Sequence, residues 1–131
     1  RKRAFDHSSP SHLTDFALLI EGQRVYVGRQ YLATHSPVFH TMLFGDFAEK
    51  DKNEVELKDM SVKDFLNLLA LIYPTSVCLT DHTVEGVLVL ADRFGFEGVI
   101  SQVEKFLLES STFLLAKKLL LADRFRLYDL K

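Results

Sequence analysis

The sequence has a single cysteine, Cys78, so no disulfide can form within the chain. That scarcity indicates a reducing compartment, the cytoplasm or the nucleus. The formal net charge is −2 over 131 residues, which excludes the basic excess expected of a nucleic-acid-binding domain. No apolar run reaches membrane-spanning length without a charge and no signal peptide is visible, so no membrane partner is expected.

Motifs for catalysis and metal binding are missing as well. The five histidines include no His-x-x-x-His pair, and one cysteine cannot build a thiolate zinc site, so no metal is expected. Ser36 lies in His-Ser-Pro rather than Gly-x-Ser-x-Gly, and the glycines are isolated rather than gathered in a phosphate-binding loop. Because nothing assembles an acid, a base and an oxyanion site, we expect neither an enzyme nor a cofactor.

What is present is a composition of 47% hydrophobic and 26% charged residues, sufficient for one domain with a real core. Residues 1–13 gather serine and proline without an apolar period and are expected to form a flexible tail. Residues 15–20 and 24–27 are expected to form a β-hairpin with Gly22 in its tight turn. Residues 54–58 alternate polar and apolar side chains, as a half-exposed strand does.

Helices are expected in most of the remaining chain. Ser36-Pro37 predicts a break between two short helices, because serine is a good cap and proline favours the first helical position. Ser61 opens a helix that is apolar nearly all round and is therefore expected to be central and buried. Further helices are predicted from an N-terminal cap at Thr80 or Asp81 to Gly95, from about residue 97, and over 113–124.

This order of elements predicts an α+β fold with a small sheet at one side of a helical cluster. A parallel crossover is not expected, because strands do not alternate with helices. The pentapeptide Leu-Ala-Asp-Arg-Phe occurs at 90–94 and again at 121–125. Two copies are too few for a solenoid, so we interpret them as two helices with the same packing: leucine and alanine inward, aspartate and arginine in water.

The segment 46–53 reads DFAEKDKN and places an aromatic residue, Phe47, in a polar loop. Two interpretations are open from the loop alone. In the first, Phe47 folds back and covers the edge of the core. In the second, Phe47 projects as an apolar anchor and Glu49 orients a partner, since aromatic anchors ringed by polar groups are common binding hot spots.

Several segments together resemble the BTB/POZ domain family. They include VYVGRQYLATHSPVF at 25–39, Glu-Val-Glu-Leu at 54–57, the Ile72-Tyr73 helix end and the Leu-Ala-Asp helix at 90. The resemblance covers 14–109 in the family's element order, which we therefore take as the BTB/POZ domain, and residues 110–131 resemble the start of a post-BTB helix pair. It is greatest to MATH–BTB or BTB-only substrate adaptors of cullin-3 ubiquitin ligases.

The resemblance implies an adaptor that binds the cullin-3 N-terminal domain and brings substrates to a ubiquitin ligase through a domain outside this chain. Its apolar–x–Glu motif matches Phe47-Ala48-Glu49, and Tyr73 matches a tyrosine near the same face. The alternative is a homo-oligomerisation module of a transcriptional regulator or another scaffold without cullin binding. For a homodimer, the family's interface positions match Asp15, Arg29 and Tyr31. Gly28 departs from the family, which usually has histidine there.

Overall fold

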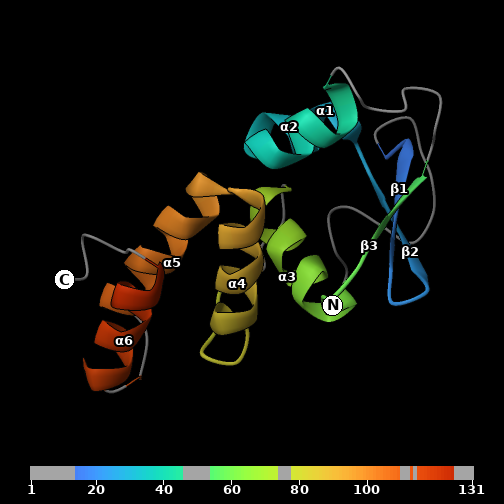
Figure 1. The fold of residues 1–131 in the computed structure, drawn as a ribbon. Coiled ribbons are helices and arrows are strands. Elements are labelled where there is room, and N and C mark those ends of the chain that lie inside the picture. Colours follow the sequence, from blue (N-terminus) through green and yellow to red (C-terminus); the bar gives the residue numbers. More distant parts are fainter. Residues whose placement is uncertain (1–13, 46–53, 74–77, 110–112, 114, 126–131) are drawn as a thin grey trace.

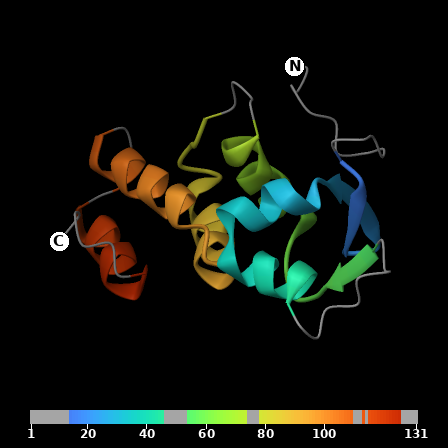
Figure 2. The same ribbon diagram turned by 90° about the horizontal axis from the view of Figure 1, so that it is seen from above.

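The computed structural model describes residues 14–45, 54–73, 78–109, 113 and 115–125. In this part of the chain a three-stranded sheet stands at one end and helices occupy the rest (Figure 1). Seen from above, α5 and α6 lie at the end opposite the sheet (Figure 2). The predicted α+β architecture, a small sheet beside a cluster of helices, is confirmed.

The predicted hairpin consists of β1 (Phe16–Ile20) and β2 (Gln23–Val27), which pair antiparallel. Glu21 and Gly22 connect them with φ angles of 52° and 76°. Two positive φ values in a two-residue loop are the requirement of a type I′ turn, whose twist matches that of the strands. All residues of β1 except Leu19 are buried.

The third strand, β3 (Glu54–Leu57), pairs with β1 in parallel, so the sheet order is β2-β1-β3. The expectation that the chain contains no parallel crossover is therefore wrong for this pair. Two helices between β2 and β3 supply the long connection that a parallel pair needs. Strand periodicity identifies a strand but not its partner, so the sequence pattern did not predict this pairing.

Those two helices are α1 (Arg29–His35) and α2 (Pro37–Phe44), and the predicted break between them is confirmed. The Ser36 hydroxyl oxygen accepts a hydrogen bond from the Phe39 N–H at 3.1 Å and donates one to the Phe94 carbonyl. Ser36 is completely buried. It therefore caps α2 and also ties that cap to the end of a helix far along the chain.

The remaining helices are α3 (Val62–Ile72), α4 (Val84–Phe94), α5 (Glu97–Glu109) and α6 (Leu115–Phe125). The prediction that Thr80 or Asp81 caps α4 is wrong, because the cap is Thr83. Thr80 and Thr83 instead close a turn before the helix: the Thr83 N–H donates to the Thr80 carbonyl at 3.1 Å and the Thr80 N–H to Thr83 Oγ1 at 3.0 Å.

Phenylalanine rings form the centre of the core where α2, α3 and α4 meet. The Phe39 and Phe94 rings stack with centroids 4.7 Å apart, and Phe65 and Phe96 lie within 6.4 Å of one of these two rings. The two pentapeptide copies, 90–94 and 121–125, both bury leucine and alanine and expose aspartate and arginine. Their predicted common packing is confirmed.

Candidate functional site

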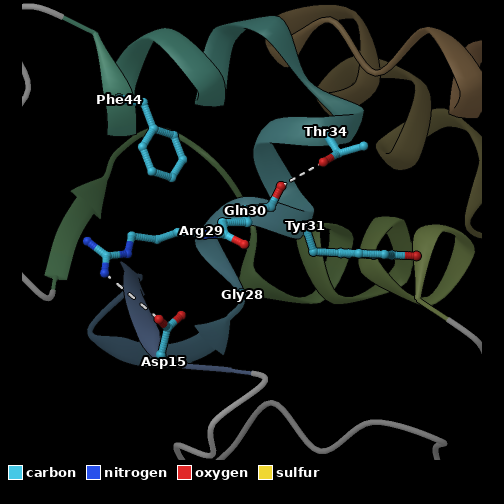
Figure 3. Close-up of a pocket in the computed structure, with 7 residues that line it drawn as sticks. All are labelled: Asp15, Gly28, Arg29, Gln30, Tyr31, Thr34 and Phe44. Carbon is cyan, nitrogen blue, oxygen red and sulfur yellow. Dashed lines mark hydrogen bonds and ion pairs between the residues drawn. The ribbon is translucent and has the colours of Figure 1, made fainter.

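An open cavity of about 530 Å³ lies where α1 leaves the sheet. It is bounded by the residue before β1, the start of α1 and the end of α2 (Figure 3). Its lining residues are Asp15, Gly28, Arg29, Gln30, Tyr31, Thr34 and Phe44. Three of the residues predicted from the family resemblance for a dimer interface, Asp15, Arg29 and Tyr31, therefore border one cavity.

The charged pair of the cavity is loosely held. Arg29 Nη2 and Asp15 Oδ2 are 3.8 Å apart, and the two side chains are 30% and 50% exposed. The guanidinium carbon of Arg29 lies 5.5 Å from the centroid of the Phe16 ring, which limits where the arginine can go. An exposed pair at this distance is worth at most about 1 kcal/mol. Both charges are therefore available to a partner at little cost.

Apolar surface lies beside these charges. Phe44, the last residue of α2, is 40% exposed and points its ring into the cavity (Figure 3), and Tyr31 is 37% exposed. Phe44 was not identified from the sequence. A signal existed, because Phe44 falls outside the face of α2 that buries Phe39 and Leu43. Exposed aromatic rings next to charged groups are a composition typical of protein interfaces.

Tyr31 also connects the cavity to the end of α3. Its side chain runs away from Arg29 and Phe44 (Figure 3), and its hydroxyl donates a hydrogen bond to the Ile72 carbonyl. The ring centroids of Tyr31 and Tyr73 are 4.6 Å apart. The phenol oxygen of Tyr73 in turn accepts a hydrogen bond from the Gly28 N–H at 2.9 Å. Burial raises the pKa of the Tyr73 hydroxyl above its ordinary value.

Of the residues predicted for cullin binding, only Tyr73 belongs to the part of the chain that the structure describes. Tyr73 is only 5% exposed, so it stands behind Tyr31 and does not line the cavity. The segment Phe47-Ala48-Glu49 lies outside the described residues. The structure therefore joins Tyr73 to the group predicted for the dimer interface, a contact that sequence spacing did not indicate.

A second groove, of about 420 Å³, lies between the end of α3 and α5. It is lined by Leu71, Cys78, Leu79, Gln102, Lys105, Phe106 and Glu109. Among the described residues, no group of three or more histidine, cysteine or acidic side chains is placed to hold a metal ion. Nor does any helix there have the length and apolarity to cross a membrane. The described surfaces also expose aliphatic side chains, among them Leu115 and Leu120 of α6.

Comparison with known families identifies the fold. The sequence model of the BTB/POZ domain matches residues 5–111. The solved BTB domain of human gigaxonin superposes with a TM-score of 0.60 at 23% identity, over 72% of this chain and 77% of that one. That likeness concerns the fold alone.

Curated relatives are found in Caenorhabditis elegans. The chain is 37% identical over 121 residues to BTB and MATH domain-containing protein 38 and 39% identical over 120 residues to BTB and MATH domain-containing protein 36. In both cases 92% of this chain is matched, but only 31% and 38% of the relative. Human Kelch-like protein 30 is 35% identical over 91 residues, or 70% of this chain and 16% of that protein. The chain thus spans less than half the length of these relatives.

Proposed function

The chain belongs to the BTB/POZ family, whose members are protein-interaction modules, and on that premise we propose that it binds the N-terminal domain of cullin-3 as a ubiquitin-ligase adaptor. The observation that carries the proposal is the apolar–x–Glu sequence Phe47-Ala48-Glu49 in a chain with MATH–BTB relatives. Substrates would be recruited by a domain outside this chain, consistent with relatives that are far longer. A single cysteine, Cys78, suits the cytoplasm or the nucleus.

In this proposal Phe47 is the apolar anchor and Glu49 orients the partner. In the sequence the motif follows the end of α2 at Phe44 and precedes the start of β3 at Glu54. Tyr73 contributes from behind: with 5% of its surface exposed, it acts mainly through the Tyr31 ring and the backbone of α1. Helices after residue 110, of which α6 is described, would extend the same surface.

The test is binding of the cullin-3 N-terminal domain to Phe47→Asp, measured by calorimetry. Loss of a buried aromatic anchor should weaken binding by about 2 kcal/mol or more, roughly thirtyfold. Val89→Asp is the matched control, because it places the same charge on an apolar side chain of α4 that is 42% exposed. Equal affinity of wild type and Phe47→Asp would refute the anchor, and equal weakening by both variants would refute its assignment to Phe47.

A second candidate function is homo-oligomerisation through Asp15, Arg29 and Tyr31. The observation that favours it is the open cavity, which presents a loosely paired charge beside two exposed aromatic rings. This candidate does not exclude the first, because a dimeric adaptor would use both surfaces. If the chain does not bind the cullin-3 N-terminal domain, homo-oligomerisation remains as its proposed function. The chain would then be a module of a transcriptional regulator or of another scaffold.

A further inference from the structure

The junction between α1 and the end of α3 contains two tyrosines, and the hydroxyl of each forms a hydrogen bond with a backbone group beside the other tyrosine's helix. Tyr31 on α1 donates to the carbonyl of Ile72, the last residue of α3. Tyr73, the next residue, accepts from the N–H of Gly28, which precedes α1. The two rings lie against each other with centroids 4.6 Å apart. We refer to Tyr31 and Tyr73 as the tyrosine pair.

Both backbone groups belong to helix ends, where intrahelical partners run out. The N–H groups at the start of a helix and the carbonyls at its end have no partner within the helix. Gly28 is buried, so its N–H cannot turn to water instead. An unpaired buried N–H is costly. Each tyrosine hydroxyl therefore satisfies a group that the other helix leaves open.

Helix α1 has little else to hold it. It is seven residues long, has no side-chain hydrogen bond at its N-cap and no acidic residue in its first turn, and buries only Leu32. A helix this short is not stable without tertiary contacts. Apart from its continuation from β2 and into α2, α1 is thus attached to the body of the domain by Leu32, by the tyrosine pair and by the loose contacts of Arg29 with Asp15 and Phe16.

We propose that the tyrosine pair is a positioning device for α1. It fixes the start of the helix, and with it Arg29, Gln30 and Thr34, which line the cavity. Without either hydroxyl, α1 opens locally while the rest of the domain stays folded. Tyr73 is then a positioning residue: it follows α3, but its hydroxyl acts on the start of α1. The proposal does not depend on cullin binding.

The test compares Tyr31→Phe and Tyr73→Phe, which keep both rings and remove one hydroxyl each. Native-state hydrogen exchange is followed at the amides of Leu32 and Ser36, whose acceptors are the carbonyls of Gly28 and Leu32 and are unchanged by either substitution. These amides should exchange about tenfold faster in each variant, the change expected for one lost hydrogen bond. Amides in the middle of α5 should keep their wild-type rates.

Two controls separate local opening from general destabilisation. Val103→Ala creates a cavity in the fully buried face of α5, and should accelerate amides that exchange through global unfolding. Thr34→Ala removes an exposed hydroxyl within α1 that bonds the Gln30 carbonyl at 2.8 Å. It should leave exchange in α1 unchanged or slower, because alanine favours helix.

Acceleration of α1 and α5 by the same factor, or no acceleration of α1, would overturn the proposal. The double variant tests whether the hydroxyls act as a pair. Because both hold the same junction, its effect on the Leu32 and Ser36 amides should be smaller than the product of the two single effects. If the double variant accelerated exchange by the full product of the two single factors, the two hydroxyls would act independently. That result would also contradict the proposal.

Discussion

At the scale of single residues, buried polar side chains sit where two elements meet and bond both. Ser36 caps α2 and bonds the carbonyl of Phe94 at the end of α4. The hydroxyl of Tyr73, on the residue after α3, bonds the N–H before α1. Such groups stabilise one arrangement of helices over others, because any shift leaves a buried donor or acceptor unpaired.

Tyr73 should make the domain sensitive to alkaline pH. Burial raises the pKa of Tyr73, so the folded state favours the neutral phenol more than the unfolded state does. The contribution is complete below the unfolded pKa of about 10 and is lost at about 1.4 kcal/mol per pH unit above it, until the folded pKa is passed. Urea unfolding at pH 9, 10 and 11 measures this loss. Tyr73→Phe should show a shallower decline, and an identical slope would contradict the assignment.

Ser36→Ala should lower the free energy of unfolding more than the equivalent substitution at another helix cap. Ser61 caps α3 by accepting from the Asp64 N–H at 3.3 Å and is partly exposed. Ser61→Ala should therefore lower the free energy of unfolding by about 1 kcal/mol. Ser36→Ala removes the cap and also leaves a buried carbonyl unpaired, so about 2–3 kcal/mol is expected. Equal costs in denaturant unfolding would show that the Phe94 contact contributes nothing.

At the scale of elements, the residue that ends one helix determines the direction in which the chain enters the next. Gly95 ends α4 with φ of 70°, and the Phe96 N–H reaches back to the Ala91 carbonyl at 2.8 Å. This is the Schellman arrangement, which suits glycine. A Cβ at position 95 would also lie 3.2 Å from Pro37. The turn into α5 thus depends on a residue without a side chain.

Two glycine substitutions should act in opposite directions. Gly95→Ala imposes a left-handed backbone on alanine and crowds Pro37, so a loss of about 1–2 kcal/mol is expected. Gly98→Ala lies near the start of α5, where a Cβ meets nothing within 4 Å. It should stabilise the fold by up to about 1 kcal/mol, since alanine favours helix and restricts the unfolded chain. Thermal unfolding of both variants shows whether each substitution raises or lowers the stability. A change in the same direction for both would contradict this explanation.

At the scale of the whole molecule, the sheet, α1 and α2 converge on the cavity that contains Asp15 and Arg29 (Figure 3). α6 lies alongside α5 at the end away from the sheet (Figures 1 and 2). A chain that self-associates through the cavity therefore leaves α6 free for another partner.

Phe44→Asp should abolish self-association through the cavity. The substitution places a charge on an aromatic side chain that is 40% exposed and borders the Asp15–Arg29 pair. Sedimentation velocity at tens of micromolar should show a dimer for wild type and a monomer for the variant. Leu120→Asp, on an α6 residue that is 71% exposed, is the control and should remain dimeric. A monomeric wild type would remove the homo-oligomer from consideration.

Local sequence signals predicted most elements, while long-range pairing escaped them. Gly22, Ser36-Pro37 and Gly95 each mark a boundary through backbone preference, and the structure confirms all three. The parallel β1–β3 pair, the burial of Tyr73 and the exposure of Phe44 depend on residues far apart in the chain. No period in the sequence encodes such neighbours. The resemblance to a known family suggested Asp15, Arg29 and Tyr31, and the structure brings them together around one cavity.

The parallel pairing of β1 with β3 has a consequence for synthesis. The hairpin of β1 and β2 can form as soon as its residues emerge from the ribosome, but the other edge of β1 has no partner until residue 57 is made. During that interval an apolar strand carries unpaired backbone groups on one side. The nascent chain should then be most prone to aggregation and to capture by chaperones. Ribosomes stalled shortly before β3 would hold the chain in that state.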